Sequence, residues 1–403
     1  MKLRRREFTI LACGALLGTA LSRPAAAVDK ALAPSSRAAK LYQRSIVIDA
    51  LCIPGGFEPG LDENAPLTPW MIDDVRACGV TAVNATFGAV GNLANVFEAT
   101  VAAIAQAEHE LQTHPDVFMK ITRAQHIEEA KKSKRLGLIY GFQDGSMLGT
   151  DVDRVDLFYR LGVRVIQPTY NTRNLLGDGC LEAANGGLST FGRQVIERMN
   201  SLGILVDLSH CGQQTTAEGI ATSAKPVAIT HTGCQALADR PRNKRDAELR
   251  TLAQKGGVVG IYFMPFLRMS GQPTSADAIA HLEHAIDVCG EDHVGIGSDG
   301  PTSGFEVTPE FREYFRKDVQ KRRSLGISAP GEDENVFTFL PDLNTPLRLE
   351  TLACLLIARG HSEARVEKIL GGNFARLFRE VWKDPLDAGA GKRGESARVQ
   401  QPC

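Results

Sequence analysis

The chain alternates short apolar runs with longer stretches in which apolar residues recur at helical spacing. Helical patterns such as residues 190–202 and 275–288 lie between most of the runs. Alternating strands and helices predict a parallel sheet, and eight repeats favour a (β/α)8 TIM barrel over an open doubly wound sheet. The eight predicted strands are Ser45–Ala50, Val80–Phe87, Leu136–Phe142, Val163–Thr169, Ile204–Leu208, Pro226–Thr230, Gly257–Phe263 and His293–Ser298.

One segment interrupts this alternation after the eighth predicted strand. Residues 302–346 are polar and include the charged stretch 312–323. We expect a helical insertion on the active-site face, with its helix exposed to solvent, in preference to a lid or a dimer contact. Residues 351–359 and 362–382 predict closing helices, and the Gly- and Ala-rich tail 387–403 predicts disorder.

The first 27 residues have the form of an export signal. Arg5 and Arg6 make a twin-arginine pair, residues 9–21 are apolar, and Ala25-Ala26-Ala27 is a small-residue cleavage site. The apolar stretch is too short to span a membrane. We therefore expect export to the periplasm by the twin-arginine route, with one barrel domain over residues 28–386. A lipoprotein anchor at Cys13 is disfavoured, because few apolar residues precede it.

The charge balance gives no reason to expect a nucleic-acid partner. Residues 1–27 hold five Lys and Arg and one Glu, so the remainder carries 41 basic and 46 acidic residues, a net charge of −5. The nine cysteines include no Cys-x-x-Cys pair, and a barrel of this size does not need disulfides. We expect Cys52, Cys211 and Cys234 to be packed residues rather than nucleophiles, and we assign no disulfide.

Chemically capable side chains follow three of the predicted strands. Residues 204–206 lead to His210, residues 226–229 lead to His231, and residues 294–297 lead to Asp299. Because catalytic residues of a barrel gather where its parallel strands end, we expect these three at one site. Two imidazoles and a carboxylate suit metal-assisted hydrolysis, in which a bound ion activates water. His281 and His284 lie on a predicted helix, and we expect them at its surface.

Several segments, in order along the chain, give it a resemblance to the membrane dipeptidase family, also called renal dipeptidases. The resemblance covers about residues 40–385 and implies a zinc-dependent (β/α)8 barrel. Such a protein cleaves dipeptides and tolerates a D-residue at the C-terminal position. The segments are Leu161-Gly162-Val163-Arg164, Gly187-Leu188, Phe191-Gly192, Asp207-Leu208-Ser209-His210, His231, Arg242-Asn243, Gly295-Ile296-Gly297-Ser298-Asp299 and Gly371-Gly372-Asn373.

The resemblance implies roles for four residues. His210 and His231 match the histidines that hold one zinc ion, Arg242 matches the arginine that binds the substrate carboxylate, and Asp299 matches the carboxylate that handles the water proton. The sequence also allows purely structural roles for these residues. The histidines could be buried structural residues, Arg242 could form a loop salt bridge, and Asp299 could cap the following loop.

The chain also departs from the family pattern. The His-x-Asp pair of the family's first strand falls on Leu51 and Ile53, which cannot bind an ion. The bridging glutamate falls on the neutral Gln143, and a histidine thought to steady the tetrahedral intermediate falls on Tyr170. These changes predict one zinc ion or none, with Gln143 as a weak third ligand and Tyr170 as a hydrogen-bond or proton donor.

Asp49 and Asp144 are alternative donors to that ion. The leading hypothesis is an exported dipeptidase-like hydrolase that acts on dipeptides or related small amides at an altered metal centre. Two alternatives are a different hydrolytic or lyase reaction on the same barrel, with Leu51 and Ile53 lining an apolar pocket, and a catalytically silent small-molecule-binding protein. The expected partner is a small molecule, and a homodimer is left open.

Overall fold

The computed structural model describes residues 36–56, 65–91 and 95–382. The predicted signal peptide 1–27 and the predicted tail 387–403 lie outside these residues. The strands are β1 Ile48–Asp49, β2 Cys52–Ile53, β3 Ala82–Thr86, β4 Phe118–Lys120, β5 Leu136–Phe142, β6 Val163–Ile166, β7 Leu205–Val206, β8 Ala228–Thr232, β9 Val258–Ile261, β10 Val294–Ile296 and β11 Gly300–Pro301.

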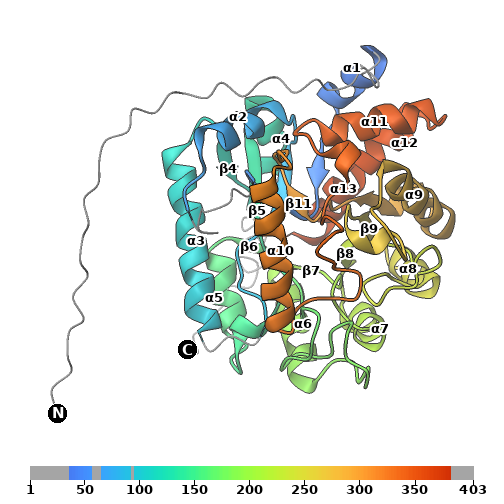
Figure 1. Ribbon diagram of the computed structural model, residues 1–403. Coiled ribbons are helices and arrows are strands. Elements are labelled where there is room, and N and C mark those ends of the chain that lie inside the picture. The colour runs from blue at the N-terminus through green and yellow to red at the C-terminus, as the bar shows by residue number, and fades with distance from the viewer. Residues whose placement is uncertain (1–35, 57–64, 92–94, 383–403) are drawn as a thin grey trace, which may run out of the picture. The chain divides into compact units, whose positions relative to one another are not determined.

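Helices follow most of the strands, as the sequence pattern predicts (Figure 1). Their ends have local causes: α6 begins where the Ser189 hydroxyl accepts from the Gly192 N–H, and it ends at Gly203 in the left-handed region. The helices are α1 Ser36–Arg44, α2 Pro69–Ala77, α3 Val96–Thr113, α4 Gln125–Ser133, α5 Arg154–Arg160, α6 Thr190–Leu202, α7 Gln213–Thr222, α8 Asp246–Gln254, α9 Ser275–Cys289, α10 Pro309–Ser324, α11 Arg348–Ala358, α12 Glu363–Glu367 and α13 Asn373–Val381.

All the strand pairs that carry the core are parallel. One curled sheet has the order β1-β3-β5-β6-β7, and a second has the order β10-β9-β8. The edges of the two sheets are hydrogen-bonded to each other: Leu208 N–H donates to the Ala228 carbonyl at 2.8 Å, and Ala50 N–H donates to the Ile296 carbonyl at 2.9 Å. The parallel α/β prediction is therefore confirmed.

Seven of the eight predicted strands contribute side chains to two separate hydrophobic clusters, and the eighth, His293–Ser298, contributes Val294 and Ile296 to the larger cluster. Ile139 and Val165 belong to the cluster that also contains Phe374 and Phe378 of α13. Their neighbours Leu138 and Ile166 belong to the larger cluster that includes the flanking helices. This alternation follows from the two-residue period of a strand. Burial on both faces explains why the strands are almost entirely apolar in sequence.

The segment after β10 forms the expected helical insertion, but its helix is not simply solvated. The Thr308 hydroxyl caps α10 by accepting from the Phe311 N–H at 3.1 Å. Phe311, Phe315 and Val319 are buried on one face of α10 and pack against the insertion's own aromatic residues, Phe305, Phe337 and Phe339. The expectation of a fully solvent-exposed helix is therefore wrong for that face.

The sequence pattern missed three short strands. β4 pairs in parallel with the first residues of β5, from Leu136 to Leu138. β2 and β11 pair with each other, with Cys52 opposite Gly300. Strands of two or three residues carry too little periodicity to be distinguished from loops. In the described part of the chain, no helix is both long and apolar enough to cross a bilayer.

Candidate active site

The two histidines that follow β7 and lie on β8 meet inside the molecule. His231 is a residue of β8, and His210 lies four residues beyond β7. Both side chains are buried, and their Nε2 atoms are 2.9 Å apart. The ring centroids lie 4.9 Å apart at an interplanar angle of 59°. The structure therefore brings the imidazoles to one point, as expected for strand-end residues of a parallel sheet.

The hydrogen-bond network assigns the proton of His210 to Nδ1. Nδ1 lies 2.7 Å from Asn171 Oδ1. The Asn171 amide cannot be reversed without loss, because its Nδ2 donates to the Ile327 carbonyl at 2.8 Å. Nδ1 therefore carries the hydrogen, and Nε2 presents a lone pair.

The same argument applies to His231. Its Nδ1 lies 2.9 Å from the Thr230 hydroxyl, which donates its own hydrogen to Asp207 Oδ2 at 2.5 Å. Asp207 also accepts from the main-chain N–H groups of Ser209 and Thr230. Thr230 must therefore accept from His231 Nδ1, and Nε2 of His231 is also a lone-pair atom.

Both histidines are neutral near pH 7. Burial, followed by the charge of Arg242, holds the pKa of His210 well below its usual range. Burial and then Arg242 do the same to the pKa of His231. Neutral imidazole is the form that binds a metal ion.

Gln143 and Arg242 both approach the His210 Nε2 atom. Gln143 Oε1 lies 3.1 Å from it. The Gln143 amide has this orientation because its Nε2 donates to the Thr86 hydroxyl at 3.0 Å. Arg242 is buried; its Nη1 donates to the Ser209 carbonyl at 2.7 Å, and its Nη2 lies 3.2 Å from His210 Nε2. Three acceptor atoms and one guanidinium N–H thus gather at this point.

This donor set fits one cation with neutral ligands. The Nε2 lone pairs of His210 and His231 and the Gln143 oxygen repel one another unless a positive species lies between them. Imidazole nitrogen and amide oxygen are both known metal donors. Within the described residues, no group of three His, Cys, Asp or Glu side chains is arranged to hold a metal ion.

Asp299 is partly buried and interacts electrostatically with Arg242. Its backbone is in the left-handed region at φ 57°, and its N–H donates to the Leu51 carbonyl at 2.9 Å. Loss of solvent raises the pKa of Asp299 to about 7, with Arg242 and then Arg322 acting in the opposite direction. A carboxyl with a pKa near neutrality suits proton transfer from water.

Tyr170 packs flat against His210. The ring centroids lie 4.1 Å apart at 23°, and Tyr170 is buried. Its hydroxyl accepts from Arg322 Nη2 at 3.3 Å, which leaves the phenolic hydrogen free to donate. Burial raises the pKa of Tyr170, so the phenol stays protonated near pH 7.

Leu51 and Ile53, which the resemblance places at the first two ligand positions, occupy different surroundings. Leu51 is buried, and Ile53 is 41% exposed. Ile53 lines a hollow of about 170 Å³ together with Thr86 and Phe87, beside Gln143. The expectation that both residues would line an apolar pocket therefore holds for Ile53, and Leu51 is not among the lining residues.

The alternative donors Asp49 and Asp144 do not face the histidines, and this expectation is wrong. Asp49 accepts from the Ser298 N–H at 2.7 Å and from the Ser298 hydroxyl at 2.5 Å. Asp144 accepts from the Gly91 N–H and from Ser146 and Asn174. Both carboxylates fasten neighbouring loops by local hydrogen bonds, which is a common use of Asp at strand ends.

The cysteines behave as packed residues. Cys52, Cys211 and Cys234 are buried free thiols, and the described residues contain no disulfide. Burial raises the pKa of Cys211 to about 11 and raises that of Cys234 further. A protonated buried thiol is a poor nucleophile.

His281 was expected at a helix surface, which is wrong. It is buried; its Nδ1 accepts from the Cys234 N–H at 2.8 Å, and its Nε2 donates to the Leu267 carbonyl at 3.0 Å. His284, on the same helix, pairs with Asp246 at 2.8 Å. His281 is therefore a structural residue that joins α9 to the loop after β8.

Sequence reasoning missed Asn171, which orients His210, and Arg322, which contacts Tyr170. Asn171 follows the predicted strand 163–169 and Tyr170 directly, so its place at a strand end was an available signal. Arg322 lies in a helix with many charged residues, and nothing in the local sequence separates it from its neighbours.

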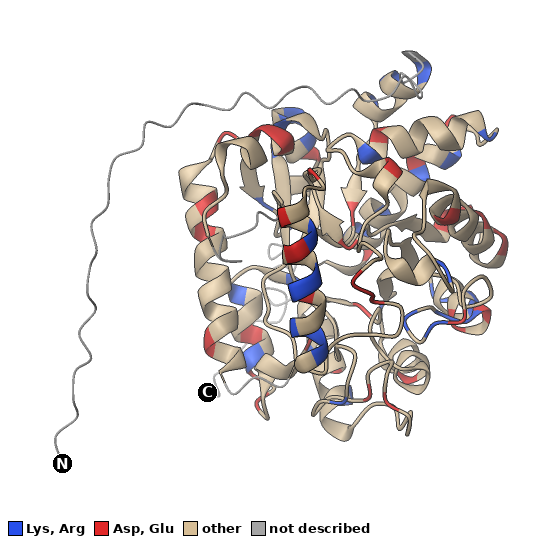
Figure 2. Ribbon diagram, in the orientation of Figure 1, with Lys and Arg blue, Asp and Glu red and all other residues tan. Residues whose placement is uncertain are grey.

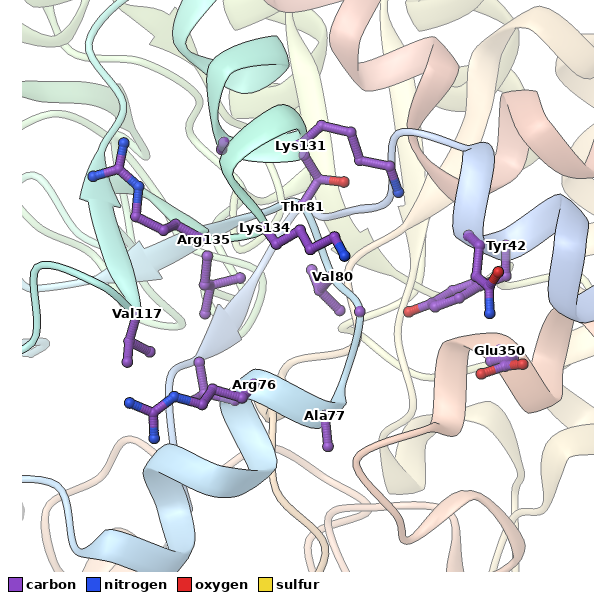
Figure 3. A pocket seen from close by; sticks show the side chains of 15 residues that line it. Tyr42, Arg76, Ala77, Val80, Thr81, Val117, Lys131, Lys134, Arg135 and Glu350 are labelled. Carbon is purple, nitrogen blue, oxygen red and sulfur yellow. The ribbon is translucent and has the colours of Figure 1, made fainter.

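A separate hollow in the described part of the chain is distinct from this site. It measures about 500 Å³ and is lined by Tyr42, Lys131, Lys134 and Glu350, among others (Figure 3). None of the predicted site residues lines it. Lys131 and Lys134 lie at the C-terminal end of α4, where cations complement the helix dipole. Their position therefore has a local structural cause.

Comparison with known proteins identifies the family of this chain. A family model described as membrane dipeptidase (peptidase family M19) matches residues 75–315. The chain belongs to the membrane dipeptidase family. This confirms the resemblance drawn from the order of the sequence motifs.

Relatives of this family member include bacterial and fungal proteins. Over 271 residues it is 28% identical to an uncharacterized protein in the pqqA 5′ region of Klebsiella pneumoniae, with 64% of this chain and 88% of that protein aligned. Over 173 residues it is 34% identical to dipeptidase verJ of Clonostachys rogersoniana. That alignment covers 42% of this chain and less than half of the fungal protein, 45%.

Solved structures of similar proteins share the fold. An amidohydrolase from Pseudomonas aeruginosa superimposes with a TM-score of 0.74 and 32% identity, covering 86% of this chain and 99% of the other. A metallo peptidase from Rhodobacter sphaeroides gives a TM-score of 0.65 over 84% of this chain and 100% of the other. At 21% identity, the second comparison shows likeness of fold alone.

Proposed function

We propose that the chain is a hydrolase with at most one zinc ion that acts on dipeptides or related small amides. The observation that carries this proposal is the convergence of His210 Nε2, His231 Nε2 and Gln143 Oε1 beside Arg242. Membership of the membrane dipeptidase family supports the reaction class. The substrate and the metal content of this chain are the parts that require experiment.

We also infer that eight strands close into one (β/α)8 barrel with the insertion 302–346 on its active-site face. The hydrogen bonds at both edges of the two sheets support closure, since they join β7 to β8 and β10 to the residue after β1. Closure supports a shared site, because all the strand ends then open onto one face.

Each side chain has a role in the proposed reaction. His210, His231 and Gln143 would hold zinc, which when bound supplies a Lewis acid and lowers the pKa of water. Asp299, with a pKa of about 7, accepts a proton from the attacking water. Arg242 offers a planar guanidinium to the substrate carboxylate. Tyr170 O–H donates a hydrogen bond to the oxygen on which charge develops.

A single ion is favoured because the second set of ligands is missing. Leu51 and Ile53 have no donor atom, and Asp49 is taken up by Ser298. Gln143 adds no negative charge with which to balance a second cation. Two ions held by neutral ligands would repel each other strongly in a buried site.

One contact favours a second candidate function, a catalytically silent binding protein. Arg242 Nη2 lies 3.2 Å from His210 Nε2, so a guanidinium N–H can satisfy this lone pair without a metal ion. In that case Arg242 would retain an anionic small molecule and no bond would be broken. Metal content and turnover separate the two candidates.

The proposed location is the periplasm, reached through the twin-arginine route. The support is the sequence of residues 1–27, with its Arg5-Arg6 pair and alanine cleavage site. Fractionation of cells that express the full chain, beside an Arg5→Lys, Arg6→Lys variant, tests it. Export of the wild type alone supports the route, and equal export of both contradicts it.

The decisive assay combines metal loading and hydrolysis. Protein is purified without added zinc, then supplied with zinc and tested on a panel of dipeptides with L- or D-residues at the C-terminal position. L-Ala-D-Ala belongs in the panel, because the structurally similar Rhodobacter sphaeroides protein is liganded with a phosphinate mimic of it. Slow, zinc-dependent hydrolysis supports the proposal, whereas binding without turnover supports the silent candidate.

A further inference from the structure

The insertion after β10 touches the candidate site at two places. The Ile327 carbonyl accepts a hydrogen bond from Asn171 Nδ2 at 2.8 Å. Arg322, in the last turn of α10, donates from Nη2 to the Tyr170 hydroxyl at 3.3 Å. These pairs lie 156 and 152 positions apart in the chain. Figure 1 shows α10 running across the front of the strands, which is the arrangement that these contacts require.

Both residues that the insertion contacts also hold His210. Asn171 accepts from the His210 Nδ1–H at 2.7 Å, and the Tyr170 ring covers one face of the imidazole at 4.1 Å. Because Ile327 takes the Asn171 N–H, the Asn171 oxygen is the group left to face the imidazole. The insertion therefore fixes the edge of the ring through Asn171 and the face of the ring through Tyr170.

One buried carboxylate fastens this part of the insertion. Glu332 is buried and accepts from Arg322 Nε at 2.7 Å and Nη2 at 3.1 Å. It also accepts from the Ser328 hydroxyl at 3.0 Å and the Ala329 N–H at 2.9 Å. The loop that carries Ile327 and the side chain of Arg322 are thus held by the same group. A paired arginine of this kind is pre-organised, unlike a free surface arginine.

The helix that presents Arg322 is itself supported. Phe311, Phe315 and Val319 pack against Phe337 and other aromatic residues of the insertion. Lys and Arg together with Glu occupy other positions along the same helix, as the blue and red segments of α10 in Figure 2 show. Among them, Arg316 pairs with Glu313 within the helix, and its side chain is 43% exposed. Arg322 differs because it points toward the site.

We propose that Arg322 and the Ile327 carbonyl are positioning groups for His210, so that the insertion, and not the barrel strands alone, sets the orientation of its imidazole. The inference rests on the proposed function only for its catalytic consequence. The positioning itself is a property of the metal-free protein. Groups that orient a metal-binding histidine from behind commonly change metal affinity about 10- to 100-fold when removed.

A purely structural role for Arg322 predicts a different outcome. If Arg322 only stabilises the insertion through Glu332, its loss would lower the melting temperature and leave His210 unchanged. If Arg322 acts through Tyr170, its loss would change the environment of His210, and removal of the Tyr170 hydroxyl alone would do the same. Both changes would act through the contact between Arg322 and the Tyr170 hydroxyl, so their effects on His210 would not add.

The experiment observes the imidazole of His210 directly by NMR. Long-range proton–nitrogen NMR spectra of the metal-free protein report the tautomer and surroundings of His210, with His210→Gln used to assign its signals. The variants are Arg322→Met, which keeps an apolar stem, Tyr170→Phe, which keeps the ring, and their combination. Arg316→Met is the matched control, because it removes an arginine from the same helix away from the site.

The expected result is a single Nδ1–H tautomer in the wild type and in Arg316→Met. Arg322→Met and Tyr170→Phe should both shift the His210 signals, and the double variant should resemble either single one. Zinc affinity should fall about 10-fold in Arg322→Met and stay unchanged in Arg316→Met. Wild-type His210 signals in Arg322→Met would overturn the inference, even if the melting temperature falls. Absence of turnover in the wild type, with or without zinc, would overturn the proposed function and leave the NMR test intact.

Discussion

The Nε2 atoms of His210 and His231 lie 2.9 Å apart although both imidazoles carry their hydrogen on Nδ1. Asn171 and Thr230 fix these tautomers from behind the rings. Two lone pairs at this separation repel, so the arrangement is costly unless a positive group lies between them. Arg242 supplies such a group in part, and a metal ion would supply it more fully.

Replacement of Arg242 should separate its effect on the pKa of His210 from its effect on substrate binding. Arg242→Met should raise the pKa of His210, because the guanidinium is the main cause after burial that lowers it. The same variant should raise KM for a dipeptide at least about 10-fold through loss of a charge-assisted hydrogen bond. KM for the amidated dipeptide should change little.

Arg242→Lys is the control for charge. It should keep the pKa of His210 low and still raise KM, since an ammonium group cannot form the planar fork. NMR titration of His210 and steady-state kinetics give both readings. An unchanged pKa of His210 in Arg242→Met would show that burial alone keeps the imidazole neutral.

Asp299→Asn should raise the free energy of unfolding relative to the wild type, and this gain should be larger at pH 8 than at pH 5. Burial raises the pKa of Asp299 to about 7, whereas an unfolded chain has an aspartate pKa of about 3.9. The folded state therefore binds more protons between these values, and this group's contribution to stability falls as pH rises through the window. Asparagine cannot ionise and avoids that loss.

Denaturant unfolding at pH 5 and pH 8 measures the Asp299→Asn effect. The gain in unfolding free energy should be larger at pH 8, while hydrolysis should be lost at both values. Equal changes in stability at the two pH values would mean that Asp299 titrates in the folded protein as it does in the unfolded chain.

Wild-type dipeptidase turnover should be low, and restoring the family ligands together should raise it. Loss of one oxyanion donor commonly costs about 100- to 1000-fold in rate, and loss of a metal site adds to that in a non-additive way. The triple variant Leu51→His, Ile53→Asp, Gln143→Glu rebuilds a complete donor set. Any one of these changes alone should not rescue activity.

Zinc-supplemented hydrolysis of the dipeptide panel compares the wild type, the three single variants and the triple variant. Circular dichroism controls for folding, since Leu51 is buried and a histidine there disturbs the core. Rescue by a single substitution, or high turnover by the wild type, would show that hydrolysis does not require the complete donor set at positions 51, 53 and 143.

The parallel α/β fold could be predicted because its strands are buried on both faces. Leu136–Phe142 was predicted with the bounds that the structure has, and Thr190–Leu202 likewise, since a serine cap and a glycine end mark that helix. β4 could not be predicted, because its three residues Phe118–Lys120 are too short to show a period.

The candidate site was predictable only where a side chain follows a strand. His210, His231 and Gln143 met this condition, and the structure brings them together. The support from Arg322 and Ile327 comes from more than 150 positions away, and local patterns carry no information about it. Asp49 was misread for a similar reason: its partner Ser298 is 249 positions away.

The number of zinc ions per chain tests the proposed mononuclear centre most directly. Protein purified without added metal is equilibrated with zinc, dialysed, and measured by elemental analysis beside His210→Ala and His231→Ala. At most one ion is expected in the wild type and none in either variant. Two tightly held ions per wild-type chain would contradict it, because the described residues would then have to supply a second ligand set in place of Leu51 and Ile53.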